Sequence, residues 1–365
     1  MSAAVLAAGA WAMSAASGRV LTAPGALPAA STPQLPAATP SATLAEWSNL
    51  ALYSAMVVFT VAMLLYAAYL AALGPAQREV RAPDKALVGA GGPAPTAAGA
   101  SDRRIAGDPA APSVRARKLA GMALSTTWLA TAILLGSVLL RGLSVSRVPW
   151  GNMFEFATAG AAGAALTYCL LARRNRWEWL GLFVVGPVLL ILGLALLAFY
   201  TEAAELMPAL KSVWLLIHVV VAILAVAVFT VAVSLGVLYL VKLRREATAP
   251  ARRTFVETLP PAASLERAAY GLNMVGFILW TFTLVAGAIW AQKAWGSYWT
   301  WDPKEVWTFV VWVVYAAYMH ARATAGWEPR KAMWIALGGF AAILVNFLVV
   351  NIYFVGQHSY SGVGG

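Results

Sequence analysis

The sequence contains very little charge. Of its 365 residues, 11% are charged and 61% are hydrophobic, whereas a typical soluble domain has about 25% charged and roughly 45–50% apolar residues. So few charges cannot cover the surface of a water-soluble protein. The scarcity of charge therefore excludes a soluble globular fold and indicates a membrane protein.

Cysteine and histidine are also scarce. The single cysteine, Cys169, lies in an apolar run, which excludes an intrachain disulfide, a CxxC redox pair and a cysteine-based zinc site. We expect Cys169 to pack as a small apolar residue. Any thiol chemistry must then come from a partner protein. Only three histidines are present, namely His218, His320 and His358.

Long apolar runs account for most of the remaining chain. A membrane-spanning helix needs about 20 mainly apolar residues, and eight segments meet or approach this length: 50–73, 119–140, 153–172, 179–200, 213–241, 270–291, 306–321 and 332–355. The seventh is the weakest, because its charge-free run is the shortest. Transmembrane barrels have short strands of alternating hydrophobicity instead. The sequence predicts an all-α polytopic membrane protein with about eight transmembrane helices.

The composition changes between these segments predict the organisation of the chain. Residues 1–46 are rich in Ala, Pro, Ser and Thr, and we expect a disordered N-terminal tail. Residues 47–355 form the predicted transmembrane domain. Within it, the Gly- and Ala-rich segment 74–118 is expected to be a flexible cytoplasmic loop, and 292–305 an outer loop. Residues 356–365 are the outer C-terminal tail.

The distribution of Lys and Arg predicts the orientation in the membrane. The net charge is +11, and 20 of the 26 basic residues fall in alternate loops. Because cytoplasmic loops carry an excess of Lys and Arg, both termini are expected outside. This asymmetry accounts for the basic excess, so we expect no nucleic-acid partner. It places His218 and His358 near the outer face and His320 at the inner end of the seventh helix.

Tryptophan is concentrated in one segment. Six of the 16 tryptophans lie between Trp290 and Trp312. One interpretation is an aromatic belt at the membrane interface, which accounts for Trp290 and Trp312. The other is a ligand-stacking face: if the intervening loop is helical, Trp295, Trp299 and Asp302 share one side of it. The residue types alone leave both interpretations open.

The segment that follows predicts the start of a helix. Asp302 suits an N-cap, Pro303 the first helical position, and Glu305 completes a capping box. The aromatic loop before it is flanked by two outer histidines, His218 and His358. Haem offers a large apolar face to indoles, and its iron takes imidazoles as axial ligands. We therefore hypothesise that these two histidines bind opposite faces of one haem.

The segment Trp295-Gly-Ser-Tyr-Trp-Thr-Trp-Asp-Pro-Lys-Glu305 resembles the WWD signature of the haem-handling protein superfamily. Over about residues 45–360 the chain resembles cytochrome c assembly proteins of the Ccs type, system II, which include CcsA, ResC and some proteins called CcsB. Pro149–Phe156 is similar to that family's segment leading into a helix from the outer side. The resemblance implies a set of haem-contacting residues: Trp295, Gly296, Tyr298, Trp299, Trp301 and Asp302.

The resemblance also implies an activity. His218 and His358 would ligate haem b at the outer face, and His320 would take part in an inner site whose second ligand comes from a ResB-like partner subunit. Haem would then be attached through thioether bonds to the CxxCH motif of apocytochrome c, reduced by a thiol-disulfide reductase. This haem lyase activity is expected only in the complex with the partner. The expected location is the bacterial plasma membrane, with the plastid thylakoid as the alternative, and membrane lipid surrounds the chain.

Other functions remain open at this point. A haem chaperone that passes haem to a separate carrier would use the same features. A cytochrome b-like subunit needs intramembrane histidine pairs, which three histidines in these positions do not provide. A haem-free transporter or structural subunit is disfavoured by nearly charge-free helix interiors. We assign no acid or base: Glu155 and Asp302 are expected to make capping or polar contacts, and Asn346 and Asn351 to hydrogen-bond between helices.

Overall fold

The computed structural model describes residues 41–79, 113–202, 212–248 and 254–358. The predicted tail up to residue 40 and most of the predicted 74–118 loop lie outside the described residues. Within the described ranges all regular structure is helical, which confirms the all-α class. The long helices are α1 (Ala42–Glu79), α2 (Val114–Ser144), α3 (Met153–Asn175), α4 (Gly181–Ala198), α5 (Val213–Glu246), α6 (Ala262–Trp295), α7 (Pro303–Ala323) and α8 (Pro329–Leu344).

Seven of these helices are long and apolar enough to cross a membrane. The exception among the described helices is α7, although it has 21 residues. Its first turn contains Lys304 and Glu305 and its last turn contains His320 and Arg322, so its apolar part is short. The polytopic character is therefore confirmed, whereas the eighth span stays a prediction.

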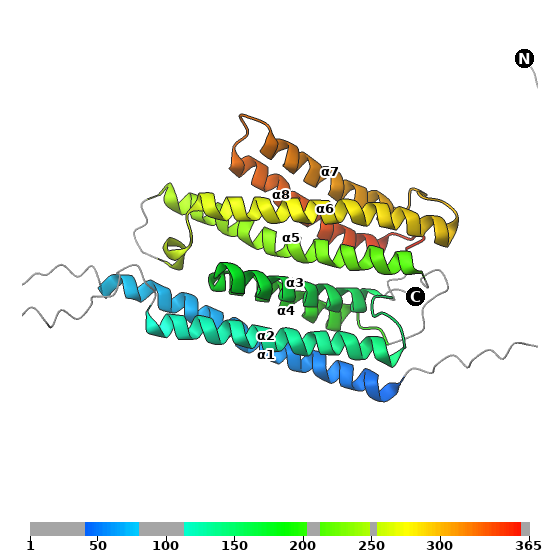
Figure 1. Cartoon of the computed structure of the whole chain (residues 1–365), viewed down its shortest axis with the longest axis horizontal. Coiled ribbons are helices and arrows are strands. Elements are labelled where there is room, and N and C mark those ends of the chain that lie inside the picture. The colour runs from blue at the N-terminus through cyan, green and yellow to red at the C-terminus, as the bar shows by residue number, and fades with distance from the viewer. Residues whose placement is uncertain (1–40, 80–112, 203–211, 249–253, 359–365) are drawn as a thin grey trace, which may run out of the picture. The chain divides into compact units, whose positions relative to one another are not determined.

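Neighbouring helices in the chain pack as pairs: α1 on α2, α3 on α4, α5 on α6 and α7 on α8. Figure 1 shows these pairs in chain order, and α3 and α5 join the two halves of the bundle. Among the seven candidate spans, α3 is the most buried. Its many alanines allow the neighbouring helices to approach closely. Cys169 lies on α3 and is fully buried, as expected for a packing residue.

Several helices extend beyond the segments expected from the sequence. α1 begins at Ala42 and ends at Glu79, and α2 begins at Val114, so both ends of the predicted 74–118 loop are helical. Ser113 caps α2 by accepting a hydrogen bond from the Ala116 amide at 3.2 Å. A helix can project beyond the apolar part of its sequence when a cap satisfies its free amides. The length of the apolar segment therefore underestimates the length of each of these two helices.

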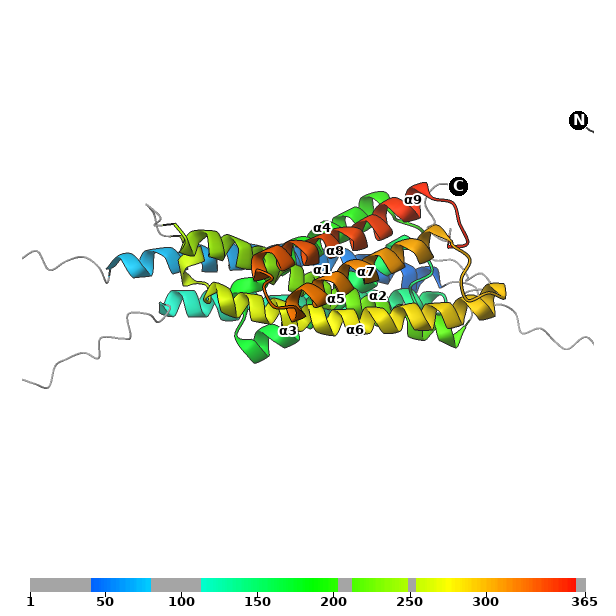
Figure 2. The same cartoon turned by 90° about the horizontal axis from the view of Figure 1, so that it is seen from above.

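One end of the bundle is built from the start of α5, the end of α6, the start of α7 and the α2–α3 connection, and we call it the pocket end. The chain after α8 returns to it: Val345–Val350 is π-helical, and α9 (Asn351–Tyr353) follows. Figure 2 shows α9 at the same end of the bundle as the start of α7. This return brings His358 to the pocket end.

A buried ion-pair network orders the α2–α3 connection. Glu155 is fully buried and pairs with Arg147 at 2.7 Å and with Arg141 at 3.3 Å. It also accepts a hydrogen bond from the Gly151 amide at 2.8 Å. These contacts confirm that Glu155 makes polar contacts, and they hold the adjacent Trp150 at the pocket end.

Candidate functional site

A pocket opens at the pocket end between α3, α5, α6, α7 and the segment that follows α8. The volume of its cavity is about 240 Å³. Most of the lining is apolar or aromatic. Its polar and aromatic members include Trp150, Asn152, His218, Trp280, Thr283, Trp290, Tyr298, Trp299, Lys304, Glu305, Thr308, Asn346, Asn351 and His358.

His218 lies in the second turn of α5 and is held from α6. Its Nδ1 is 2.9 Å from the carbonyl oxygen of Thr283. Because a carbonyl only accepts, Nδ1 carries the proton and Nε2 keeps a free lone pair. Gly287 makes this approach possible, since a Cβ there would lie 2.9 Å from the imidazole ring. The ring stacks on the indole of Trp290, with centroids 6.2 Å apart.

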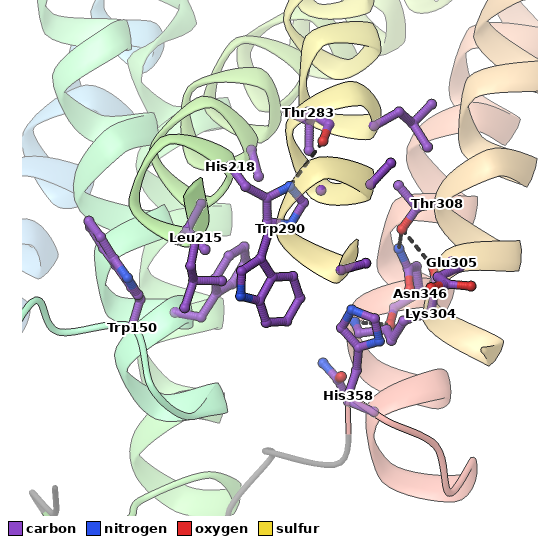
Figure 3. Close-up of a pocket in the computed structure, with 18 of the residues that line it drawn as sticks. Trp150, Leu215, His218, Thr283, Trp290, Lys304, Glu305, Thr308, Asn346 and His358 are labelled. Atoms are coloured by element: carbon purple, nitrogen blue, oxygen red, sulfur yellow. Dashed lines mark hydrogen bonds between the residues drawn. The ribbon is translucent and has the colours of Figure 1, made fainter. Parts of the chain in front are cut away.

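His358 is held in a similar way from the start of α7. Its Nδ1 is 2.8 Å from Oδ1 of Asp302, and its ring packs edge-on against Trp290 and Trp295 at centroid distances of 5.6 and 4.9 Å. Figure 3 shows the indole of Trp290 beside the imidazoles of His218 and His358. The structure therefore brings the two predicted outer histidines into one pocket, 140 positions apart in the sequence.

Asp302 has two structural roles. It caps α7 by accepting from the Lys304 amide at 2.9 Å, and Glu305 completes the capping box, as predicted. It also accepts hydrogen bonds from His358 and from the Gln357 amide. Burial by itself raises the pKa of Asp302, but these hydrogen bonds and the charge of His358 outweigh burial and hold the pKa below its ordinary value.

The tryptophan-rich loop is not helical, so the predicted shared helical face does not form. Gly296 ends α6 in the left-handed conformation at a φ of +76°, and Pro303 begins α7. Tyr298 and Trp299 line the pocket. Trp301 does not line it: its side chain is 78% exposed, and its φ is +61°, an uncommon backbone conformation for a bulky residue.

Trp290 is a pocket residue and not a member of an interfacial belt. Its side chain is only 2% exposed, whereas belt tryptophans sit at the lipid headgroups. The belt interpretation of Trp290 is therefore wrong, because α6 turns this residue inward. Trp312 is half-buried and donates from Nε1 to Oγ1 of Thr281 at 2.9 Å, which links α7 to α6.

His320 lies at the other end of α7. Sixteen positions separate it from Lys304, which corresponds to roughly 24 Å along the helix. It is exposed, and its Nε2 is 3.5 Å from Oγ1 of Thr324. The structure thus separates His320 from the pocket.

Residues that no sequence pattern singles out complete the pocket wall. One of them is Lys304, whose side chain lines the pocket. Asn346 hydrogen-bonds to Thr308 across α7 and α8, which confirms the predicted interhelical bond. The same expectation is wrong for Asn351, which donates to Phe347 of its own helical segment. No spacing in the sequence distinguishes these residues from ordinary packing residues.

The fold and the site together define a polytopic helical membrane protein with an aromatic pocket that holds two imidazoles. A model of the family described as "Cytochrome C assembly protein" matches residues 150–358, a range that begins and ends with pocket residues. The chain belongs to this family, and its role is accordingly in the maturation of cytochrome c, a process that involves haem.

Several curated relatives carry the name "Cytochrome c biogenesis protein CcsA". The chain is 32% identical to the protein of Gloeothece citriformis over 299 residues, covering 69% of this chain and 89% of the relative. It is 33% identical to the protein of Synechococcus elongatus, covering 66% and 86%. It is 32% identical to the protein of Guillardia theta, covering 62% and 80%.

Proposed function

We propose that this chain binds haem b between His218 and His358 and presents it for covalent attachment to apocytochrome c. One observation carries the proposal: the Nδ1 atom of each imidazole faces an acceptor oxygen, at 2.9 Å from Thr283 and 2.8 Å from Asp302. Histidines that bind metals usually donate their second ring N–H to a carbonyl or a carboxylate in this way. Both Nε2 atoms are then available for iron.

The pocket also suits the porphyrin. Its lining is largely apolar, with Trp290, Tyr298 and Trp299 close to the two histidines. Indole and phenol rings pack well against a large planar π-system. These residues fit haem as a substrate held at the pocket end.

The proposed reaction needs little chemistry from the chain itself. Each thioether bond forms when a cysteine thiol of the CxxCH motif adds its S–H across a haem vinyl group, so the sulfur bonds to carbon and the proton goes to the neighbouring carbon. The chain would hold haem in one position and orientation beside the incoming peptide, which removes much of the entropic barrier. The exposed Trp301 and Tyr298 lie where that peptide would approach.

The partner and the orientation belong to the same proposal. With the pocket end outside, 20 of the 26 basic residues lie on the cytoplasmic side. His320 would then contribute one ligand to an inner haem site, and a ResB-like subunit would supply the other. A thiol-disulfide reductase would keep the CxxCH cysteines reduced. The membrane would be the bacterial plasma membrane or a thylakoid membrane.

The test is the absorption spectrum of the chain purified with its ResB-like partner. His218→Ala and His358→Ala should each alter or abolish the haem spectrum of the outer site. His320→Ala should instead cause a separate loss that belongs to the inner site, because its side chain is exposed at the other end of α7. Unchanged spectra in both outer variants would disprove the ligand assignment.

A second experiment separates attachment from haem delivery to a carrier. The chain and its partner are coexpressed with apocytochrome c and with no other assembly protein. Covalent cytochrome c, detected by haem staining after denaturing electrophoresis, is the expected result. A requirement for an additional haem carrier would contradict the proposed role and favour a haem chaperone.

A further inference from the structure

One wall of the pocket is polar although the rest is mainly apolar and aromatic. This wall is formed by α7 and the π-helical segment after α8. The Nζ atom of Lys304 donates to the backbone oxygen of Asn346 at 2.9 Å, and the Asn346 side-chain amide donates to Oγ1 of Thr308 at 3.2 Å. Figure 3 shows these side chains on the α7 side of the pocket, close to His358.

Hydrogen-bonding capacity of this wall is unused within the described part of the chain. The Lys304 ammonium has three donors, and the structure uses one of them. Buried polar groups are normally paired. Donors that stay free at a pocket wall therefore point to an acceptor group of a ligand.

The backbone of α8 is distorted at the same place. Val345–Val350 runs as a π-helix, and short π-helical stretches occur frequently at functional sites. In this stretch the Asn346 carbonyl accepts from a side chain of another helix, Lys304. The ammonium is thereby held at the pocket wall instead of extending into solvent.

The charges around the pocket favour an anion at this wall. Lys304 is the one Lys or Arg among the described residues that line the pocket. The nearby carboxylate of Glu305 is already engaged, because it accepts from the amides of Thr300 and Asp302 at 2.7 and 3.2 Å. An incoming anionic group would therefore meet an ammonium with free donors, while the Glu305 carboxylate is held against the amides of the loop.

We propose that Lys304, positioned by the backbone carbonyl of Asn346, forms a carboxylate subsite that binds the propionate edge of the haem held by His218 and His358. This inference rests on the proposed function and names the part of the ligand that the wall recognises. Haem carries its two carboxylates on one side of the macrocycle and its vinyl groups away from them. Anchoring the carboxylates at Lys304 fixes the rotation of the ring about the iron–histidine axis, and hence the position of the vinyl groups.

The test compares haem with its dimethyl ester, in which both propionates are uncharged. Both are titrated into the purified full chain with its partner, and binding is followed by absorbance. A hydrogen bond to a charged group corresponds to a preference of roughly 10- to 100-fold for haem over the ester. Lys304→Met should remove this preference, and Lys304→Arg should retain part of it.

Lys293 provides the matched control, since it is exposed in the last turn of α6 and does not line the pocket. Lys293→Met should keep the full preference. Equal binding of haem and ester by the unmodified chain, or a preference that persists in Lys304→Met, would overturn the inference. Even if a variant does not fold, the comparison of haem with its dimethyl ester in the unmodified chain tests whether the propionates contribute to binding. Failure of the proposed function looks different: both compounds would then bind independently of the two histidines, or not at all.

Discussion

The Asp302–His358 hydrogen bond allows a sharp test of the site. In Asp302→Asn the side chain keeps an oxygen for the helix cap, because Asn and Asp are equally good N-caps. The single oxygen of Asn cannot accept from all three donors, however. Asp302 accepts from the Lys304 amide, the Gln357 amide and the His358 ring. The amide also removes the negative charge that supports the imidazole.

The expected effect is a loss of haem affinity with a nearly unchanged fold. Removing the hydrogen-bond partner of a metal-binding histidine typically weakens binding by about 10- to 100-fold, which equals about 1.4–2.7 kcal/mol. The assay is a haem titration of the purified complex, accompanied by a thermal unfolding curve. Asp302→Ala should lower haem affinity similarly and cost about 1 kcal/mol more stability, because it also removes the N-cap.

Glu257→Gln is the matched control for Asp302→Asn. Glu257 also belongs to a capping box, with Thr254, but it does not contact a histidine. Its substitution should leave haem affinity unchanged. An unchanged Kd for haem in Asp302→Asn would refute the argument that this carboxylate supports an iron ligand. A weakened Kd in both variants would show that loss of a capping charge, and not loss of the His358 contact, is responsible.

Three further predictions concern other parts of the structure. Gly287→Ala should weaken haem binding, because the new Cβ would lie 2.9 Å from the imidazole of His218, the proposed ligand; a haem titration measures this. Glu155→Gln should destabilise the fold by about 3–5 kcal/mol, since it leaves two largely buried arginine side chains without their shared partner charge; denaturant or thermal unfolding measures this. Trp301→Gly should keep or slightly raise Tm, because the left-handed conformation costs a non-glycine residue roughly 1–2 kcal/mol, yet it should lower the yield of attached haem in the coexpression assay. The control for Gly287→Ala is Gly271→Ala, because nothing lies within 4 Å of the added Cβ there. The control for Glu155→Gln is Glu328→Gln, because the ion pairs of Glu328 are exposed. Equal effects of a variant and its control, or full haem attachment in Trp301→Gly, would contradict these predictions.

The membrane-embedded helical class follows from the sequence because it depends on composition and length. A chain that crosses a bilayer must hydrogen-bond its backbone N–H and C=O groups internally, and long apolar segments do so as helices. The capping box at Asp302 was equally predictable, since it depends on residues within one helical turn. The ends of α1 and α2 were not predictable, because polar residues continue both helices beyond the apolar segments from which their lengths were inferred.

The WWD-like segment marked the neighbourhood of the site, but only the tertiary structure decided how its residues are used. Whether Trp290 faces lipid or the pocket depends on the rotation of α6 against α5, and local spacing does not determine that rotation. Likewise, Gly296 breaks the helix and prevents the shared face that the spacing had suggested.

The sequence by itself determined that this is an all-α membrane protein, where the apolar parts of its helices lie, and which aromatic segment and histidines are candidates for the site. Those properties depend on residue type and on near neighbours along the chain. The pairing of His218 with His358, their Nδ1 partners and the polar wall of Lys304 and Asn346 were decided by packing. These contacts join residues that are tens to more than a hundred positions apart, and only the folded bundle brings them together.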